Sequence, residues 1–122
     1  MDFKQQKAIY MQIADYILDN ILAEQLQTGD RVQSVREMAS NVQVNPNTVV
    51  RTYSYLQDKG IIFNQRGIGY FVADDAYEKT RQLKKESFTN HYLPEVFKLM
   101  RLLQIDFEDL REIYQKNQND EK

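Results

Sequence analysis

Apolar residues near the start of the chain recur at every fourth position. Four isoleucines carry this repeat: Ile9, Ile13, Ile17 and Ile21. Because the spacing places these side chains on one face of a helix, it predicts an amphipathic helix over residues 8–24. Gly29, in a short polar segment, then predicts a turn.

A second helix is predicted by a capping box. Ser34 is followed three residues later by Glu37, so each residue can bond the backbone amide of the other. The helix that begins here is expected to end near Asn41. Its inward side is expected to consist of Val35, Met38, Ala39 and Val42.

A third helix is predicted by Asn45 and Pro46, which combine a favoured N-cap with a favoured first helical residue. The helix should run from Pro46 to about Lys59, where Gly60 stops it. One face carries the apolar residues Val49, Tyr53 and Leu56. Because only a short segment separates the second and third helices, the pair has the form of a helix-turn-helix.

The pattern then changes to short β-prone segments. Ile61–Asn64 and Tyr70–Ala73 flank a stretch containing Arg66 and Gly67, which predicts a hairpin with a glycine-containing turn. From Asp75 the pattern is helical again, with a kink or break expected at Pro94 and another helix start at residues 106–109.

The order of these elements predicts a mainly α protein with a small β-hairpin. Residues 1–74 are expected to form a winged helix-turn-helix domain for DNA binding, and residues 75–122 a short two-helix tail. The tail is too short to enclose a ligand cavity, which needs at least ~300 Å³. Its apolar stripe needs a partner, and a second copy of the chain is preferred to the tail's own wing domain. The residues expected to form that dimer are Leu83, Phe88, Val96, Leu99, Met100 and Leu103.

Composition narrows the classes of function. There is no cysteine, which excludes disulfides and thiolate sites, and lone His91 cannot build a histidine-rich metal site. No nucleophile–base pair, metal cluster or phosphate-binding loop is visible, so the chain is not expected to be an enzyme or to need a cofactor. It lacks a membrane-spanning run or a signal peptide, which predicts a cytoplasmic protein that does not bind a membrane.

The charge balance argues mildly against binding to nucleic acid. The formal net charge is −2, and residues 1–74 hold 7 basic against 8 acidic side chains. DNA-binding domains are usually basic. Any affinity for DNA must therefore come from the placement of charges and from two copies of the chain acting together.

The candidate DNA contacts lie on three segments. The start of the third helix offers Asn45, Asn47 and Thr48, where free backbone amides and the helix dipole favour a phosphate. Asn47 can pair with adenine, and Arg51 with guanine. Ser34 and Arg36 begin the second helix, and Arg66 with Gly67 forms the hairpin tip. Arg31, Arg36, Arg51 and Arg66 are expected to share one surface.

The order and spacing of these segments resemble the GntR family of bacterial regulators. The resemblance covers residues 8–74 and rests on Gly29–Ala39, Val44–Val49 and Arg66–Val72. The short tail and Asn45–Thr48 resemble the YtrA-type subfamily. The resemblance implies a homodimer on a palindromic operator, usually a repressor. It assigns DNA contacts to Ser34, Arg36, Asn45, Asn47 and Thr48, and the wing tip to Arg66 and Gly67.

Two departures from the family pattern concern the DNA-binding surface. Gln33 stands where the family usually has proline, which is expected to loosen the start of the second helix. Pro46 and Val50 stand where many relatives outside this subfamily have arginine. Arg51 is not an obvious substitute, because one residue rotates a helical side chain by ~100°.

The sequence is compatible with a small-molecule effector and with a second kind of function. A small-molecule effector that releases the DNA would lie at the dimer interface or between tail and wing domain. The candidate residues for binding it are His91, Tyr92 and Arg101. The alternative function is a winged-helix adaptor that binds protein. The acidic balance favours the adaptor, whereas the polar groove residues disfavour it.

Overall fold

The chain folds into two compact units, Met1–Lys85 and Glu86–Lys122, in a computed structural model that describes residues 7–120. The first unit contains the helices α1 (Ile9–Leu22), α2 (Val35–Val42) and α3 (Pro46–Asp58). These three helices confirm the predictions to within two residues at each end, because each has a strong apolar face or a cap.

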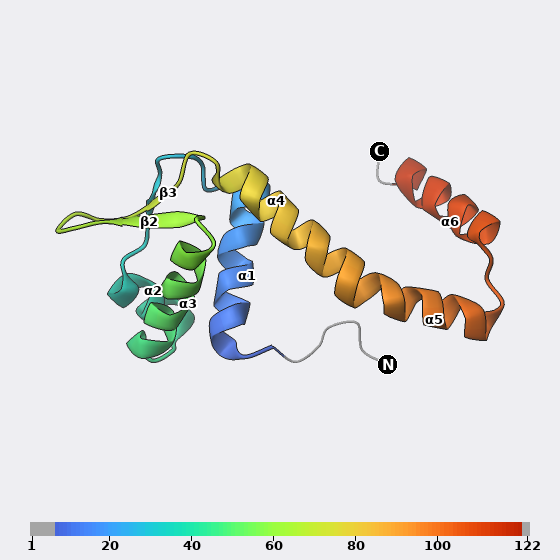
Figure 1. The fold of residues 1–122 in the computed structure, drawn as a ribbon, viewed down its shortest axis with the longest axis horizontal. Helices are drawn as coiled ribbons and strands as arrows, with labels where there is room; N and C mark the ends of the chain where they lie inside the picture. Colours follow the sequence, from blue (N-terminus) through green and yellow to red (C-terminus); the bar gives the residue numbers. More distant parts are fainter. Residues whose placement is uncertain (1–6, 121–122) are drawn as a thin grey trace. The chain divides into compact units, whose positions relative to one another are not determined.

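A three-stranded antiparallel sheet completes the winged helix (Figure 1). Strands β2 (Ile62–Gln65) and β3 (Gly69–Val72) form the predicted hairpin, each shifted by one residue from its expected end. The sequence missed β1 (Arg31–Val32), which pairs with β3 and gives the order β1-β3-β2. A strand of two residues has no period to detect, so only the fold reveals it.

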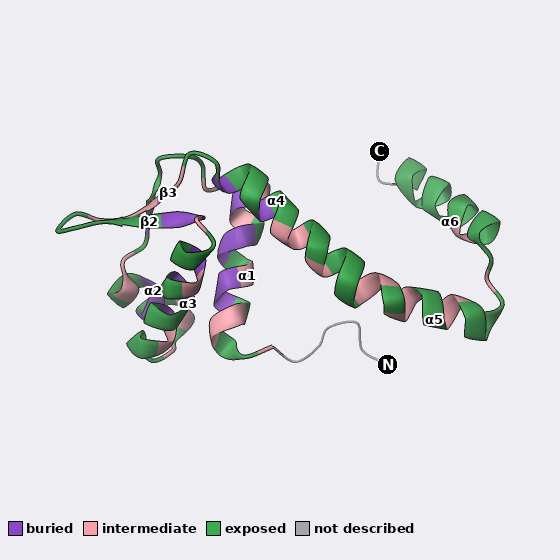
Figure 2. Cartoon of the chain, viewed as in Figure 1, coloured by how far each residue is buried: buried purple, intermediate pink, exposed green. Residues whose placement is uncertain are grey.

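The core of the first unit lies between the helices and the inner face of the sheet (Figure 2). Helix α3 contributes its apolar face, since Val49, Tyr53 and Leu56 are all fully buried. Helix α1 contributes its isoleucine face, although Ile9 at its start is 53% exposed. This packing presents one side of α3 to the core and the opposite side to solvent.

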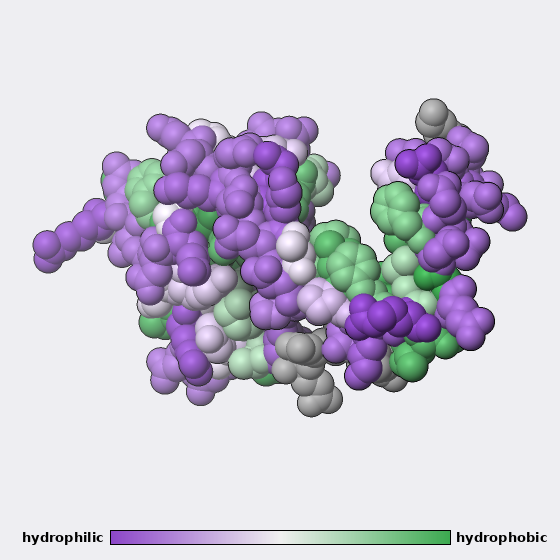
Figure 3. All heavy atoms as spheres, turned by 45° about the vertical axis from the view of Figure 1, so that its right-hand side comes forward, coloured by the Kyte–Doolittle hydropathy of each residue, from purple (hydrophilic) through white to green (hydrophobic). Residues whose placement is uncertain are grey.

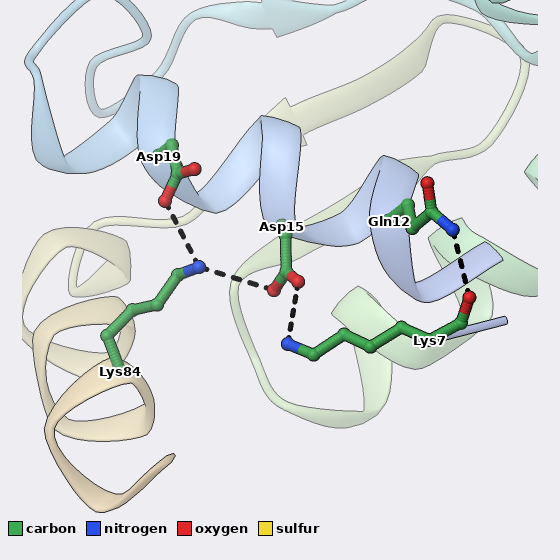
Figure 4. Close-up of polar contacts among 5 residues, drawn as sticks. All are labelled: Lys7, Gln12, Asp15, Asp19 and Lys84. Carbon is green, nitrogen blue, oxygen red and sulfur yellow. Dashed lines mark hydrogen bonds and ion pairs between the residues drawn. The ribbon is translucent and has the colours of Figure 1, made fainter. Parts of the chain in front are cut away.

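The start of helix α4 (Ala76–Ser87) belongs to the first unit. Ala76 and Thr80 are fully buried, and Leu83 packs partly against the same core. The ammonium of Lys84 lies 3.2 Å from a carboxylate oxygen of Asp15 and 3.1 Å from one of Asp19, both on α1 (Figure 4). Asp15 also pairs with Lys7 at 2.7 Å. Apolar contacts therefore join α4 to the core of the first unit, and the ion pairs of Lys84, in the last turn of α4, join it to α1.

These contacts place residues beyond the expected domain boundary at residue 74 in the first compact unit. The first compact unit ends at Lys85, so it includes most of α4. Burial opposes the charge of Lys84, but its hydrogen bonds to Asp19 and Asp15 raise the pKa of the ammonium overall. The assignment of DNA binding to residues 1–74 and of dimerisation to residues 75–122 stays a prediction.

The second unit consists of a π-helical turn η1 (Phe88–Tyr92), helix α5 (Leu93–Leu103) and helix α6 (Phe107–Asp120). The interruption expected at Pro94 takes the form of η1, which ends two residues before the proline. Proline cannot donate a backbone hydrogen bond and its ring crowds the preceding turn. The amide of Leu93 accordingly bonds back to the carbonyl of Phe88, five residues earlier, in the wider π geometry.

No described residue of η1, α5 or α6 is fully buried. Apolar side chains lie at the surface of this unit, where Figure 3 shows them in green. The large apolar residues that are exposed here are Phe88, Phe97, Leu102, Leu103, Phe107, Ile113 and Tyr114. Such a surface is unusual for a unit that stays alone in water.

Candidate DNA-binding surface

Helix α3 is divided lengthwise into a buried face and an exposed face. Val49, Thr52, Tyr53 and Leu56 have no exposed surface. The exposed face has the same i, i+3, i+4, i+7 spacing and consists of Asn47, Val50, Arg51 and Ser54. We call these four residues the outward stripe. Two of the residues predicted to contact DNA, Asn47 and Arg51, belong to it.

The amides at the start of α3 are less available than the sequence suggested. Pro46 has no N–H, the amide of Asn47 donates to Oδ1 of Asn45 at 2.8 Å, and that of Thr48 donates to the carbonyl of Asn45 at 2.9 Å. The expectation of free amides in this segment was therefore wrong, because the asparagine cap uses them. The helix dipole remains as a local attraction for phosphate.

Arg51 is stacked on an aromatic ring of α1. Its guanidinium carbon lies 3.9 Å from the centre of the Tyr10 ring, a cation–π geometry. The backbone carbonyl of Tyr10 in turn accepts a hydrogen bond of 2.8 Å from the buried hydroxyl of Thr52. Tyr10 therefore both orients Arg51 and joins the start of α1 to α3. The sequence alone gave no sign of this role for Tyr10.

The start of α2 has the predicted capping box. The amide of Glu37 donates to Oγ of Ser34 at 3.1 Å, and the amide of Ser34 donates to Oε1 of Glu37 at 3.0 Å. The backbone and side-chain hydrogen bonds of Ser34 hold the pKa of the Glu37 carboxyl below its usual value. Glu37 is thus occupied as a cap, while the neighbouring Arg36 is exposed.

The carbonyl just before this cap is held by a buried tyrosine. The hydroxyl of Tyr53 donates to the carbonyl oxygen of Gln33 at 2.6 Å, and its ring meets that of Tyr70 edge-on at 4.8 Å between centroids. Burial raises the pKa of Tyr53, so the hydroxyl remains a neutral donor. This bond fixes Gln33 from α3, so the loosening expected from Gln33 in place of proline is opposed by Tyr53.

The wing tip is a tight turn. Gly67 has φ +79°, and the amide of Ile68 donates to the carbonyl of Gln65 at 2.9 Å. A positive φ at the third turn position favours glycine and places Arg66 at the second position, exposed. Figure 1 shows the hairpin projecting as a wing beyond the helices of the first unit.

The four arginines expected on one surface are all exposed and all belong to the first unit. Arg31 lies over β3, where a Cβ atom added to Gly69 would come within 3.1 Å of its Nε. Two of the acidic residues of this unit, Asp15 and Asp19 on α1, are paired with Lys7, which precedes that helix, and with Lys84 of α4 (Figure 4). The four arginines are therefore exposed, whereas these two aspartates are neutralised by lysines, although the net charge of the chain is slightly negative.

No effector site emerges from the candidates named for it. His91 and Arg101 are exposed, and Tyr92 is half-buried. An open hollow of about 250 Å³ occurs in the first unit, lined by residues such as Ile21, Leu26 and Tyr77, and it includes none of those candidates. Among residues 7–120, no cluster suits a metal ion, and each helix is too short or too polar to cross a bilayer.

Comparison with known proteins agrees with this geometry. Residues 9–72 match the family described as bacterial regulatory proteins, gntR family. The chain is 41% identical to the uncharacterized HTH-type transcriptional regulator YhcF of Bacillus subtilis, over 90% of this chain and 89% of YhcF. It is 36% identical to the HTH-type transcriptional repressor YtrA of the same organism, over 62% of this chain and 58% of YtrA.

The fold also matches a solved structure over nearly the whole chain. A putative transcriptional regulator of the GntR family from Bacteroides thetaiotaomicron superimposes with a TM-score of 0.81 at 39% identity, covering 94% of this chain and all of the other. The family consists of DNA-binding regulators rather than enzymes, and the residues that match it include α2 and α3. The protein therefore belongs to the GntR family and is a DNA-binding transcription regulator.

Proposed function

We propose that the protein is a homodimeric repressor that binds a palindromic operator through α3 and the wing. The observation that carries the proposal is the division of α3 into a fully buried face and the outward stripe. A helix that is anchored along one side and polar along the other is suited to enter a major groove. The similarity to YtrA, which is named a transcriptional repressor, supports repression rather than activation.

The second unit supports the dimer. Its exposed apolar side chains need to be covered, and a symmetric copy offers the same surface in return. Of the predicted contact residues, Phe88 and Leu103 are exposed, Val96, Leu99 and Met100 are half-buried, and Leu83 packs on the first unit. Phe97, Leu102 and Phe107 were not predicted and enlarge the surface.

A dimer also compensates for the small number of basic residues that one chain offers to DNA. A dimer on a twofold-symmetric site doubles the number of phosphate and base contacts, and half-sites are typically about 34 Å apart. A protein that acts on chromosomal DNA in this way works in the cytoplasm. A small-molecule effector bound at the dimer interface or near the tail would control release.

The DNA-binding surface is tested by a gel-shift titration against DNA selected from a random pool and against the promoter of the protein's own operon. Arg36→Ala, and the pair Asn47→Ala with Thr48→Ala, should abolish binding and leave the thermal midpoint nearly unchanged. Arg81→Ala is the matched control, since it removes an equal charge from a pair with Glu78. A clearly lower thermal midpoint for Arg36→Ala would show that Arg36 has a structural role instead.

The dimer is tested by sedimentation of the full chain. Phe97→Glu with Leu103→Glu should give monomers and weaken operator binding, because it places charges on the apolar surface. Tyr16→Glu, at an exposed position on α1, should leave the dimer intact. A Phe97 and Leu103 variant that still sediments as a dimer would contradict the assignment of this surface.

A further inference from the structure

The outward stripe of α3 contains one apolar side chain. Val50 is 46% exposed, whereas Val49 beside it has no exposed surface. A single exposed valine is ordinary on a protein surface. This one lies between Asn47 and Arg51 on the side of α3 that faces away from the core, where contact with DNA is proposed. Its place on the helix, rather than its exposure alone, is informative.

Helix stability does not account for Val50. Valine loses side-chain freedom in a helix and is a weaker helix former than alanine, arginine or lysine. No core packing compensates for this, since the core of the first unit is formed by the opposite side of α3. The residue is therefore explained better by what the outward stripe contacts than by folding.

The major groove offers one apolar group that valine can recognise. Thymine carries a C5 methyl there, whereas guanine, cytosine and adenine present hydrogen-bonding groups. A valine placed against the amino group of cytosine would remove it from water without a partner, which is unfavourable. Contact with a thymine methyl instead buries apolar surface on both sides.

The two neighbours of Val50 in the stripe differ in the freedom of their side chains. The amide side chain of Asn47, three residues earlier on the same face, suits adenine. Arg51 is held on the ring of Tyr10 at 3.9 Å, so its guanidinium is directed toward α1. The part of the stripe that remains for direct contact with bases is thus chemically suited to A·T pairs.

We propose that Val50 is a specificity-determining residue that contacts the C5 methyl of a thymine in each half-site. This inference rests on the proposed insertion of α3 into the major groove. The contact gives preference for thymine over cytosine at one position and needs no hydrogen bond or charge. The contact adds to base recognition in a protein whose outward stripe has one cationic side chain, Arg51, which is already stacked on Tyr10.

The inference is tested with an operator obtained by selection from random DNA. Each thymine is replaced in turn by deoxyuridine, symmetrically in both half-sites, which removes only the methyl. For the wild type, affinity should fall at one position by about fourfold per half-site, the equivalent of ~0.8 kcal/mol for one buried methyl-sized group. Val50→Ala should bind the thymine operator more weakly and respond much less to deoxyuridine at that position.

Two further arms separate the possible failures. Replacing that thymine by cytosine should weaken wild-type binding, and 5-methylcytosine should restore part of the loss. Because Val50 is exposed and alanine is the better helix former, Val50→Ala should not lower the thermal midpoint. If the wild type binds selected DNA but wild type and Val50→Ala respond alike to deoxyuridine everywhere, this inference is overturned while the proposed function stands. If the wild type binds no selected DNA, the proposed function fails and the inference with it.

Discussion

The hydrogen bond between Tyr53 and Gln33 provides a sensitive test of how the DNA-binding surface is held together. Tyr53→Phe removes one oxygen and keeps a ring that is fully buried and packed edge-on against Tyr70. The bond that is lost has a length of 2.6 Å and joins α3 to the residue that precedes the cap of α2. The substitution therefore isolates this link from the packing of the core.

The size of the effect follows from the surroundings of the two partners. Gln33 is an exposed residue, so water can bond its carbonyl in the variant. A net loss of about 1 kcal/mol is expected, in the usual range for one hydrogen bond. For a cooperative unit of the size of Met1–Lys85, this corresponds to a fall of about 4–8 °C in the thermal midpoint.

Denaturant titration followed by circular dichroism measures the change, with an unaltered slope showing that only stability has changed. Tyr16→Phe is the matched control, because Tyr16 is 56% exposed and should lose almost nothing. Operator affinity should also fall for Tyr53→Phe, since the start of α2 carries Ser34 and Arg36. Equal midpoints for the two variants would refute the assigned role of Tyr53.

The same residue predicts a dependence on alkaline pH. Burial raises the pKa of Tyr53 above its unfolded value of about 10, so the folded state holds the phenolic proton more tightly. This stabilisation is fully present below pH 10 and is lost as pH rises above it, at up to ~1.4 kcal/mol per pH unit. Tyr53→Phe should lose stability less steeply above pH 10. Parallel curves for wild type and variant would contradict this.

Three other substitutions test the packing of the first unit. Asn45→Ala should lower the unfolding free energy by about 1 kcal/mol by removing the cap of α3, and Asn45→Ser should restore most of it. Thr80→Val should raise stability by about 1 kcal/mol or more, since no hydrogen-bond partner is found in the described structure for this buried hydroxyl. Lys84→Met should speed amide hydrogen exchange in the last turn of α4, because both ion pairs to α1 are lost.

Each of these has an outcome that would contradict it. Asn45→Ser as unstable as Asn45→Ala would mean that capping is not the cause. A lower midpoint for Thr80→Val would show that the hydroxyl has a partner. Lys85→Met removes an exposed charge from the next position on α4 and should not change exchange; equal exchange in the two lysine variants would exclude a role for the ion pairs.

The sequence determined the helices and their order because their signals are local. The isoleucine repeat of α1, the cap at Ser34 and the cap at Asn45 each act within one or two turns, so neighbouring residues suffice to predict them. The same holds for the glycine turn of the wing. The outward position of Asn47 and Arg51 also followed from the helical period alone, and the period would equally have placed Val50 beside them.

The tertiary structure decided the features that depend on residues far apart in the chain. Strand β1 exists because Arg31 and Val32 meet β3 about forty residues later. Tyr53 reaches Gln33, and Arg51 stacks on Tyr10, only after α1, α2 and α3 have packed. The amides of α3 proved to be used by their own cap, and α4 proved to begin within the first unit. Long-range contacts of this kind leave no periodic pattern in the sequence. They depend on how whole helix and sheet faces pack together, and not on residues that are neighbours in the chain.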